Sequence, residues 1–292
     1  MRLLFTIPHF YRPNPRPPAG ADAPHGSEGA RAEVRARALL SCLSALHQTF
    51  GGRQAYMAAP PEPCNARIAA EIAVIVCTTR GHHLLRHLPA NLFRYHETDA
   101  EPRFLGYECH AVLAQNLGRF DYYCFLEDDL VLTDALFFWK QRWFSSAAGD
   151  RAVLQPQRFE LAFDLPIHKL YIDGPIVDPT IAPRFQDKSV RPLIRARCLG
   201  VEIAFERADN PHSGCFFLTD AQMARWAKAP YFLDRAAGFW GPLESAATLG
   251  VMRTFEVYKP ALANAGFLEI RHLDNRYLGG LLRFGGGDRA AT

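Results

Sequence analysis

Three short apolar runs, separated by segments with helical periodicity, constrain the fold of this chain more than any other feature. The runs span residues 2–7, 72–77 and 122–126. Between them, residues 30–50 and 105–117 carry apolar side chains at helical spacing, and a glycine follows each segment. Continuous apolar runs indicate strands that are covered on both faces. Strands alternating with helices in this order predict an α/β fold with a mainly parallel sheet flanked by helices.

Glu127, Asp128 and Asp129 directly follow the third apolar run and precede another short one, residues 130–132. Carboxylates at the end of a buried strand repel one another and lose hydration, so their burial needs compensation, usually by a bound cation. The spacing suggests a hard divalent ion beside a phosphate-bearing ligand. A solvated acidic turn is the alternative that this segment alone leaves open.

Polar residues also follow the other two predicted strands. His9 comes after the first strand, and Thr78 and Arg80 come at the end of the second. Ligands of parallel sheets bind outside the carboxyl ends of the strands. The convergence of polar groups at one edge favours the ligand-binding interpretation, and it makes His9, Thr78 and Arg80 candidate contacts of a nucleotide or diphosphate.

Length and charge restrict the class of protein. The 292 residues suit one large α/β domain or two small ones. A formal net charge of +3 gives no indication of nucleic-acid binding. The seven scattered cysteines, with no Cys-x-x-Cys pair, are typical of reduced thiols in a cytoplasm. No apolar run is long enough to cross a membrane, so any membrane contact would be peripheral.

The chain between and beyond these runs is less regular. Residues 13–29 are predicted to form a loop and residues 285–292 a disordered tail. Thr133 is predicted to cap a helix. Residues 155–197, with many prolines and several basic side chains, are predicted to form an irregular insertion. Residues 210–218 indicate a turn that enters an apolar strand.

The last third of the chain supplies further candidate site residues. Thr219 is predicted to cap a short helix. Glu244 lies at the start of a helix that we expect to end at Gly250. Residues 251–258 alternate like a strand, and a final apolar stretch ends in His272.

The segment 125–134 resembles the Asp-x-Asp region of the GT-A glycosyltransferases. Its Glu-Asp-Asp form is particularly similar to that of the N-acetylglucosaminyltransferase I family, in which a helix with aromatic residues also follows. Here Phe137, Phe138 and Trp139 occupy that helix. The resemblance implies a GT-A, Rossmann-like fold. It also implies that residues 1–150 form the nucleotide-sugar-binding half and residues 151–284 the acceptor-binding, catalytic half.

The resemblance also implies roles for individual residues. Asp129 would coordinate Mn²⁺ or Mg²⁺ bridging the diphosphate of the donor. Glu127 would lie near the ribose or assist the metal through water, and Asp128 would orient the donor sugar. Glu244 resembles the catalytic base of inverting members, and His272 resembles a late histidine on the metal or diphosphate.

Each downstream assignment has a simpler alternative. Ser213 and Gly214 resemble a small-residue turn that contacts the donor sugar or the acceptor, but they equally fit an ordinary turn before a strand. Glu244 could be a helix-start acid with no chemistry, in which case a retaining mechanism becomes preferable. His272 could be a core or surface histidine.

Together these features predict a metal-dependent glycosyltransferase. It would move a sugar from a nucleotide sugar, expected to be a UDP-sugar, to a glycan or a lipid-linked acceptor. We expect a cytoplasmic enzyme that meets a membrane only peripherally at its inner face. One alternative is a sugar-phosphate nucleotidyltransferase, although the Gly-rich loop of those enzymes is missing after the first strand. The other is a non-catalytic carbohydrate- or divalent-ion-binding protein.

Overall fold

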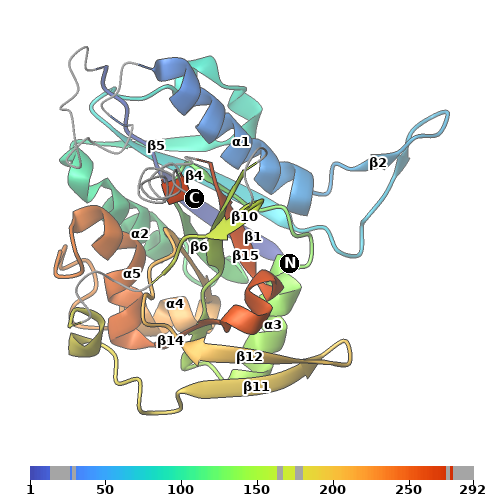
Figure 1. The fold of residues 1–292 in the computed structure, drawn as a ribbon. Helices are drawn as coiled ribbons and strands as arrows, with labels where there is room; N and C mark the ends of the chain where they lie inside the picture. The colour runs from blue at the N-terminus through green and yellow to red at the C-terminus, as the bar shows by residue number, and fades with distance from the viewer. Residues whose placement is uncertain (14–26, 28–30, 163–166, 175–179, 274–276, 279–292) are drawn as a thin grey trace, which may run out of the picture.

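The computed structural model describes residues 1–13, 27, 31–162, 167–174, 180–273 and 277–278. The predicted tail and most of the predicted loop 13–29 lie outside these residues. A five-stranded sheet forms the centre of the molecule, with strand order β13–β6–β1–β4–β5 (Figure 1). Its strands are β1 (Arg2–Pro8), β4 (Glu71–Thr79), β5 (Arg94–Thr98), β6 (Tyr122–Leu126) and β13 (Cys215–Thr219). All are parallel except β13, which pairs antiparallel with β6.

Helices cover both faces of this sheet, as the sequence predicts. The helices are α1 (Ala32–Phe50), α2 (Leu105–Gln115), α3 (Phe137–Ala148), α4 (Asp220–Ala227) and α5 (Pro242–Thr254). Side chains alternate along β1, so that Leu3 and Phe5 pack with α1 and α3, whereas Leu4 packs with α2, α4 and α5. The predicted α/β fold with a mainly parallel, helix-flanked central sheet is confirmed.

Two smaller sheets lie beside the central one. The first has the order β10–β9–β15–β7, and the second has the order β11–β12–β14–β8. Their strands are β7 (Leu130–Val131), β8 (Ala152–Leu154), β9 (Gln157–Leu161), β10 (Lys169–Tyr171), β11 (Leu193–Cys198), β12 (Val201–Arg207), β14 (Glu256–Pro260) and β15 (Glu269–His272). Short 3-10 helices are η1 (Leu85–His87), η2 (Ala90–Leu92), η3 (Pro102–Phe104), η4 (Ala182–Arg184) and η5 (Leu262–Phe267).

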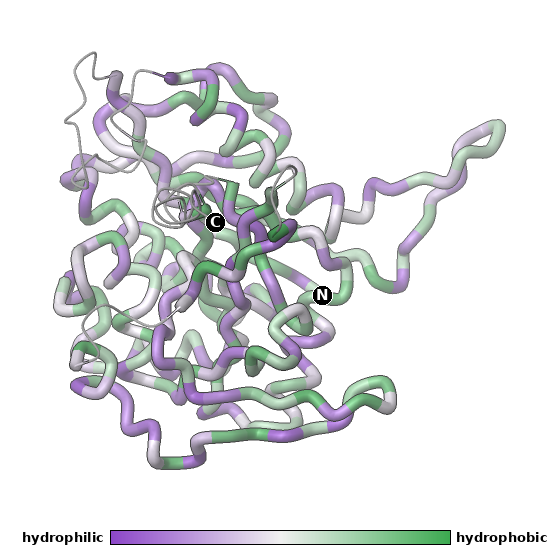
Figure 2. Tube along the Cα trace, viewed as in Figure 1, coloured by the Kyte–Doolittle hydropathy of each residue, from purple (hydrophilic) through white to green (hydrophobic). Residues whose placement is uncertain are grey.

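A two-stranded arm, β2 (Ala55–Tyr56) and β3 (Glu62–Pro63), projects away from the body of the molecule (Figure 1). Its tip is coloured as hydrophobic in Figure 2, and Met57 is 93% exposed there. Within the described ranges, no helix has the length and apolar character needed to cross a membrane.

Several predicted boundaries are wrong for identifiable reasons. Residues 155–197 are not irregular throughout, because β9, β10 and β11 form there as short strands with polar side chains. Thr133 does not cap α3, which begins four residues later at Phe137. The helix predicted to end at Gly250 continues to Thr254, so the strand expected from residue 251 starts only at Glu256.

Gly250 is therefore a packing residue and not a helix terminator. A Cβ atom at Gly250 would lie 2.2 Å from the Trp226 ring, so only glycine lets α5 approach α4 this closely. The prediction at Thr219 is confirmed, since its hydroxyl accepts from the Gln222 backbone N–H and the Gln222 side chain accepts from the Thr219 N–H.

His110 is a titratable group inside this core. It lies on α2 with its ring centroid 4.8 Å from that of Trp226, and its Nε2 donates to the Ala246 carbonyl at 2.9 Å. Burial lowers the pKa of His110 to about 4 from its ordinary value of 6.5. Because the folded pKa lies below the unfolded pKa, the unfolded chain binds the proton more readily.

We predict that His110 makes the fold acid-sensitive. Its contribution to stability is complete above pH 6.5 and is lost progressively as the pH falls toward 4. Urea unfolding at pH of about 7 and about 5 should show a loss of roughly 2 kcal/mol from this residue.

The matched variant is His110→Phe, which keeps an aromatic ring in the cluster and removes the titration. Its free energy of unfolding should fall less between the two pH values, by about 2 kcal/mol, than that of the wild type. Equal losses in both proteins would contradict the assignment.

Candidate active site

The three acids lie in a tight turn between β6 and β7. The Leu130 N–H donates to the Glu127 carbonyl at 3.2 Å and closes the turn, while the Glu127 N–H donates to the Gly214 carbonyl at 3.0 Å. Because β1 and β6 are parallel neighbours, with Thr6 opposite Phe125, this turn lies beside the residues that follow β1. The predicted convergence of these two strand ends is therefore observed.

His9 supports the acidic turn through a hydrogen bond to Asp128. Its Nε2 accepts from the Leu84 backbone N–H at 3.2 Å, so the proton of the neutral ring is on Nδ1, which donates to Asp128 at 2.6 Å. His9 is fully buried and both of its ring nitrogens are engaged. Its geometry favours holding Asp128 in place over the direct nucleotide contact that the sequence predicts.

Arg35, in the first turn of α1, supplies a positive charge to two of the acids. Its guanidinium donates to Asp128 and also to Asp129, the latter at 3.2 Å. Burial alone would raise the pKa of Asp128, but Arg35 and the hydrogen bond from His9 outweigh it, and the pKa is lowered. Asp128 is thus held as an anion behind the cavity described below.

Strand pairing brings His272 to the same place from the far end of the chain. β15 pairs with β7, with His272 opposite Leu130, and this places the His272 Nε2 atom 4.0 Å from an Asp129 carboxylate oxygen. The other ring nitrogen, Nδ1, contacts the buried Glu160 at 3.0 Å. Burial opposes protonation, but Glu160 and Asp129 raise the pKa of His272.

Glu127 lies between opposing charges. Burial and the neighbouring Asp129 raise its pKa to about 7, although Arg158 and His272 act in the other direction. Arg158, on β9, is held through its Nε by Asp173 at 2.7 Å. Burial would raise the pKa of Asp173, yet Arg158 and Lys259 lower it to about 2. This buried cluster fixes a second cation beside the acidic turn.

A cavity of about 360 Å³ opens over these groups. Such a volume lies in the range of small-molecule sites. Glu244 enters it from the first turn of α5, and Trp240, which is 46% exposed, borders it just before that helix. Ionisable side chains that line the cavity are Arg35, Arg103, Glu127, Asp128, Asp129, Arg158, His212, Glu244, His272 and Tyr277.

Like His9, the other two residues predicted at strand ends do not line this cavity. Thr78 is fully buried at the end of β4. Arg80 is exposed and its guanidinium donates to the Asp99 carbonyl at 2.8 Å. The cavity forms where β1 and β6 end, and neither Thr78 nor Arg80, at the end of β4, is among its lining residues.

Ser213 and Gly214 shape the site without lining the cavity. Ser213 is fully buried and its hydroxyl donates to the Pro156 carbonyl at 2.9 Å. Gly214 has φ +62, and a Cβ atom there would lie 2.3 Å from a Glu127 carboxylate oxygen. The small-residue turn therefore makes room for Glu127, and neither residue is among those that line the cavity.

The residues give a divalent cation a partial set of ligands. Among the described residues, no group of three or more His, Cys, Asp or Glu side chains is arranged to hold a metal ion. However, the buried Oδ1 of Asp129 has no hydrogen-bond partner among them, and the His272 Nε2 faces the same carboxylate. A carboxylate that holds the second nitrogen of a histidine is typical of metal ligands. Mg²⁺ commonly takes one or two carboxylates and completes its shell with water and phosphate oxygens, so Asp129 fits that role. The His272 imidazole suits a softer ion than Mg²⁺, such as Mn²⁺, better.

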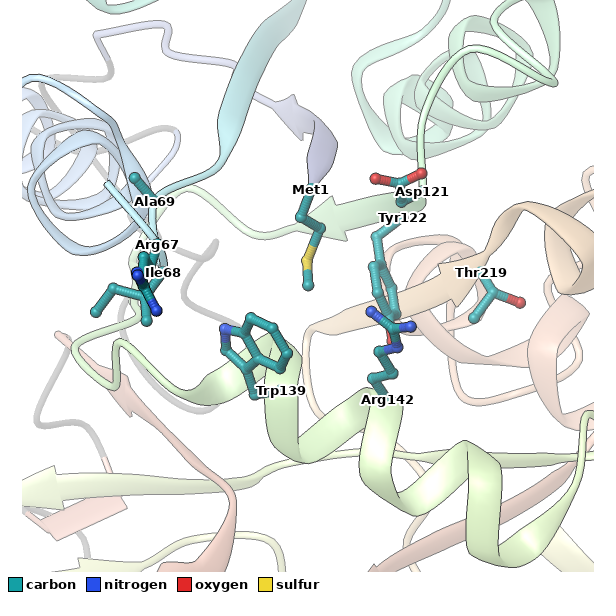
Figure 3. A pocket seen from close by; sticks show the side chains of 9 residues that line it. All are labelled: Met1, Arg67, Ile68, Ala69, Asp121, Tyr122, Trp139, Arg142 and Thr219. Carbon is teal, nitrogen blue, oxygen red and sulfur yellow. The ribbon is translucent and has the colours of Figure 1, made fainter. Parts of the chain in front are cut away.

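A second cavity, of about 470 Å³, lies at the end of the central sheet where β1 and β6 begin. Figure 3 shows the side chains that line it. Met1 and Tyr122, at the starts of β1 and β6, line it together with Trp139. Its single acidic side chain, Asp121, is ion-paired with Arg2 at 3.7 Å. Ligands of parallel sheets bind at the other edge, so this cavity is not the candidate active site.

Sequence reasoning missed three residues of the site. Arg35 looks like a solvated residue of an amphipathic helix, and Arg158 and Glu160 fall in the segment predicted to be irregular. Period-two alternation across 157–161 would have been the only available signal for the strand that carries them.

Comparisons with known proteins give limited information. No protein-family model matches the chain, and no curated protein does. Among solved structures, the TarS 1–349 crystal structure from S. aureus is similar at TM-score 0.45 and 9% identity, covering 97% of this chain and 64% of that one. A second S. aureus TarS structure has TM-score 0.43 and 9% identity, covering 97% and 39%. The chain thus spans less than two-thirds of either TarS chain, and similarity at this level carries no argument.

We predict that Gly214→Ala destabilises the protein because it combines backbone strain with a steric conflict at Glu127. Strain at positive φ costs about 1–2 kcal/mol, and overpacking adds about 1–3 kcal/mol. Urea unfolding should therefore show a loss of roughly 3 kcal/mol.

Gly118→Ala is the matched control, since Gly118 has φ +77 and nothing lies within 4 Å of an added Cβ. This variant should lose only about 1 kcal/mol of stability, from the backbone strain alone. If the two variants lose the same stability, the close approach of Gly214 to Glu127 is not a constraint.

Proposed function

We propose that this protein is a glycosyltransferase that uses a nucleoside-diphosphate sugar and a divalent cation. The observation that carries the proposal is the convergence of Asp129 and His272 at one cavity. A buried carboxylate oxygen of Asp129 has no hydrogen-bond partner within the described part of the chain, and the histidine is oriented by Glu160. Asp129 and His272 would hold Mn²⁺ or Mg²⁺. The bound ion would neutralise the charge that develops on the diphosphate leaving group.

Two arginines, Arg158 buried and Arg35 partly exposed, support an anionic ligand in this cavity. Arg35 and Arg158 line it, and each is anchored by carboxylates that keep its guanidinium in place. Arg158 would stabilise the departing diphosphate from the β9 side, because preorganised cations stabilise developing negative charge without reorganising. The donor is proposed to be a UDP-sugar and the acceptor a glycan or a lipid-linked glycan.

Glu244 is the proposed base. The acceptor hydroxyl must lose a proton as its oxygen attacks the anomeric carbon, and a carboxylate on the acceptor side can take that proton. Glu244 reaches the cavity from α5, an element different from those that carry Asp129 and His272. Trp240 beside Glu244 offers an apolar face for a sugar ring. Attack assisted in this way inverts the anomeric configuration.

The similarity to TarS lies below the level that carries an argument, so the proposal rests on the residues of the cavity.

We predict that UDP together with Mn²⁺ raises the melting temperature of the protein. At ligand concentrations about 100 times the dissociation constant, the stabilisation is about 3 kcal/mol, which corresponds to roughly 5–10 °C. Asp129→Asn should abolish the Mn²⁺-dependent part of the shift, as measured by differential scanning fluorimetry.

The control for this experiment is Asp134→Asn. Asp134 is a nearby carboxylate that pairs with Lys140 at 2.7 Å and does not line the cavity. It should keep the full shift. Absence of any shift in the wild type across a panel of nucleotides and metals would contradict the proposed function.

Glu244→Gln should lower kcat by about 10²–10⁴, because it removes general base catalysis. The shift with UDP and Mn²⁺ should remain, since the base does not hold the donor. Release of nucleoside diphosphate from a nucleotide sugar measures turnover, with Glu62→Gln in the projecting arm as the control variant.

The same assay separates the alternatives. Pyrophosphate release from a nucleoside triphosphate and a sugar phosphate would indicate a nucleotidyltransferase. Full activity of Glu244→Gln would favour a retaining mechanism. Binding without any turnover would indicate a non-catalytic carbohydrate- or ion-binding protein.

A further inference from the structure

Arg35 joins α1 to the acidic turn and is nearly enclosed, with a side chain 16% exposed. Its two terminal nitrogens donate to Asp128 and to Asp129. It is therefore the resident positive charge on the carboxylate that is proposed to bind a divalent ion.

This ion-pair network is incomplete in a specific way. Among the described residues, the buried Nε of Arg35 has no acceptor and the buried Oδ1 of Asp129 has no donor. Buried polar groups are rarely left without partners. One group requires an anionic or neutral acceptor and the other requires a cation or a hydrogen-bond donor. Both residues line the same cavity, so a ligand that carries phosphate oxygens and a cation would complete both.

We propose that Arg35 couples the two parts of the ligand, binding the phosphate groups and, until they arrive, weakening the binding of the metal at Asp129. In the absence of nucleotide, the guanidinium repels a divalent ion and occupies one oxygen of Asp129. When a diphosphate is bound, its charge neutralises Arg35, and Asp129 becomes a stronger ligand. This inference rests on the proposed function for the identity of the ligand.

The coupling predicts that one substitution changes the affinities for Mn²⁺ and for UDP in opposite directions. Replacing Arg35 by glutamine should tighten Mn²⁺ binding in the absence of nucleotide, because a repelling charge is removed. The same change should weaken UDP binding in the absence of metal, because a phosphate contact is lost. Typical coupling between two sites changes affinity by about 5–150-fold, and each effect should lie in that range. A residue with a merely structural role would weaken both.

The experiment measures the two affinities separately. Free Mn²⁺ is followed by electron paramagnetic resonance in a titration without nucleotide, and UDP is titrated calorimetrically in the presence of EDTA. The proteins are the wild type, Arg35→Gln, Arg35→Lys and Arg103→Gln. Arg103 also lines the cavity, but it pairs with Glu101 at 2.9 Å and so serves as the matched cation.

The expected result is tighter Mn²⁺ and weaker UDP for Arg35→Gln, and wild-type Mn²⁺ affinity for Arg103→Gln. Arg35→Lys should keep near-wild-type Mn²⁺ affinity because it keeps the charge, and it should bind UDP more weakly because it lacks the Nε donor. Circular dichroism checks that each variant is folded. If Arg35→Gln does not fold, Arg35→Lys decides: Mn²⁺ affinity close to that of the wild type supports the inference, and a large increase overturns it.

Weaker or unchanged Mn²⁺ binding by a folded Arg35→Gln overturns the inference and leaves the proposed function intact. If the wild type binds neither Mn²⁺ nor UDP, both the proposed function and the inference are overturned.

Discussion

The acids Glu127, Asp128 and Asp129 lie side by side at the end of β6, where Asp128 is buried and the other two are only partly exposed, so this turn loses hydration that carboxylates need. The surrounding elements compensate this loss with two arginines. α1 supplies Arg35 to Asp128 and Asp129, and β9 supplies Arg158 near Glu127. One Asp129 carboxylate oxygen is not compensated in this way, because it has no hydrogen-bond partner among the described residues. The unmet requirement lies at the cavity, where a ligand can meet it.

The topology explains how distant segments reach this turn. Parallel pairing of β1 with β6 brings His9 beneath Asp128, and antiparallel pairing of β15 with β7 brings His272 to Asp129. Gly214 leaves the space that the Glu127 carboxylate fills. The small sheet β10–β9–β15–β7 is therefore part of the site, since it carries both His272 and the Glu160 that orients it.

The sequence was informative wherever one local pattern decides the structure. Continuous apolar runs located β1, β4 and β6, and Thr219, predicted as a helix cap, marked the start of α4. Tertiary contacts that no local pattern carries account for the errors. A glycine after an apolar helical segment is typical of a helix end, but Gly250 lies within α5, where its missing side chain leaves room for the Trp226 ring. In the sequence, Arg35 and Arg158 look like ordinary surface residues. Only the fold places them beside buried carboxylates.

The central claim is that Asp129 and His272 form the protein half of a metal site that a diphosphate completes. A crystal structure of the protein grown with UDP and Mn²⁺ would test it most directly, because the anomalous signal of manganese locates the ion independently of any model of the site. The account predicts a peak within about 2–2.5 Å of an Asp129 carboxylate oxygen and of the diphosphate. UDP bound in this cavity with manganese elsewhere, or both bound outside it, would contradict the account.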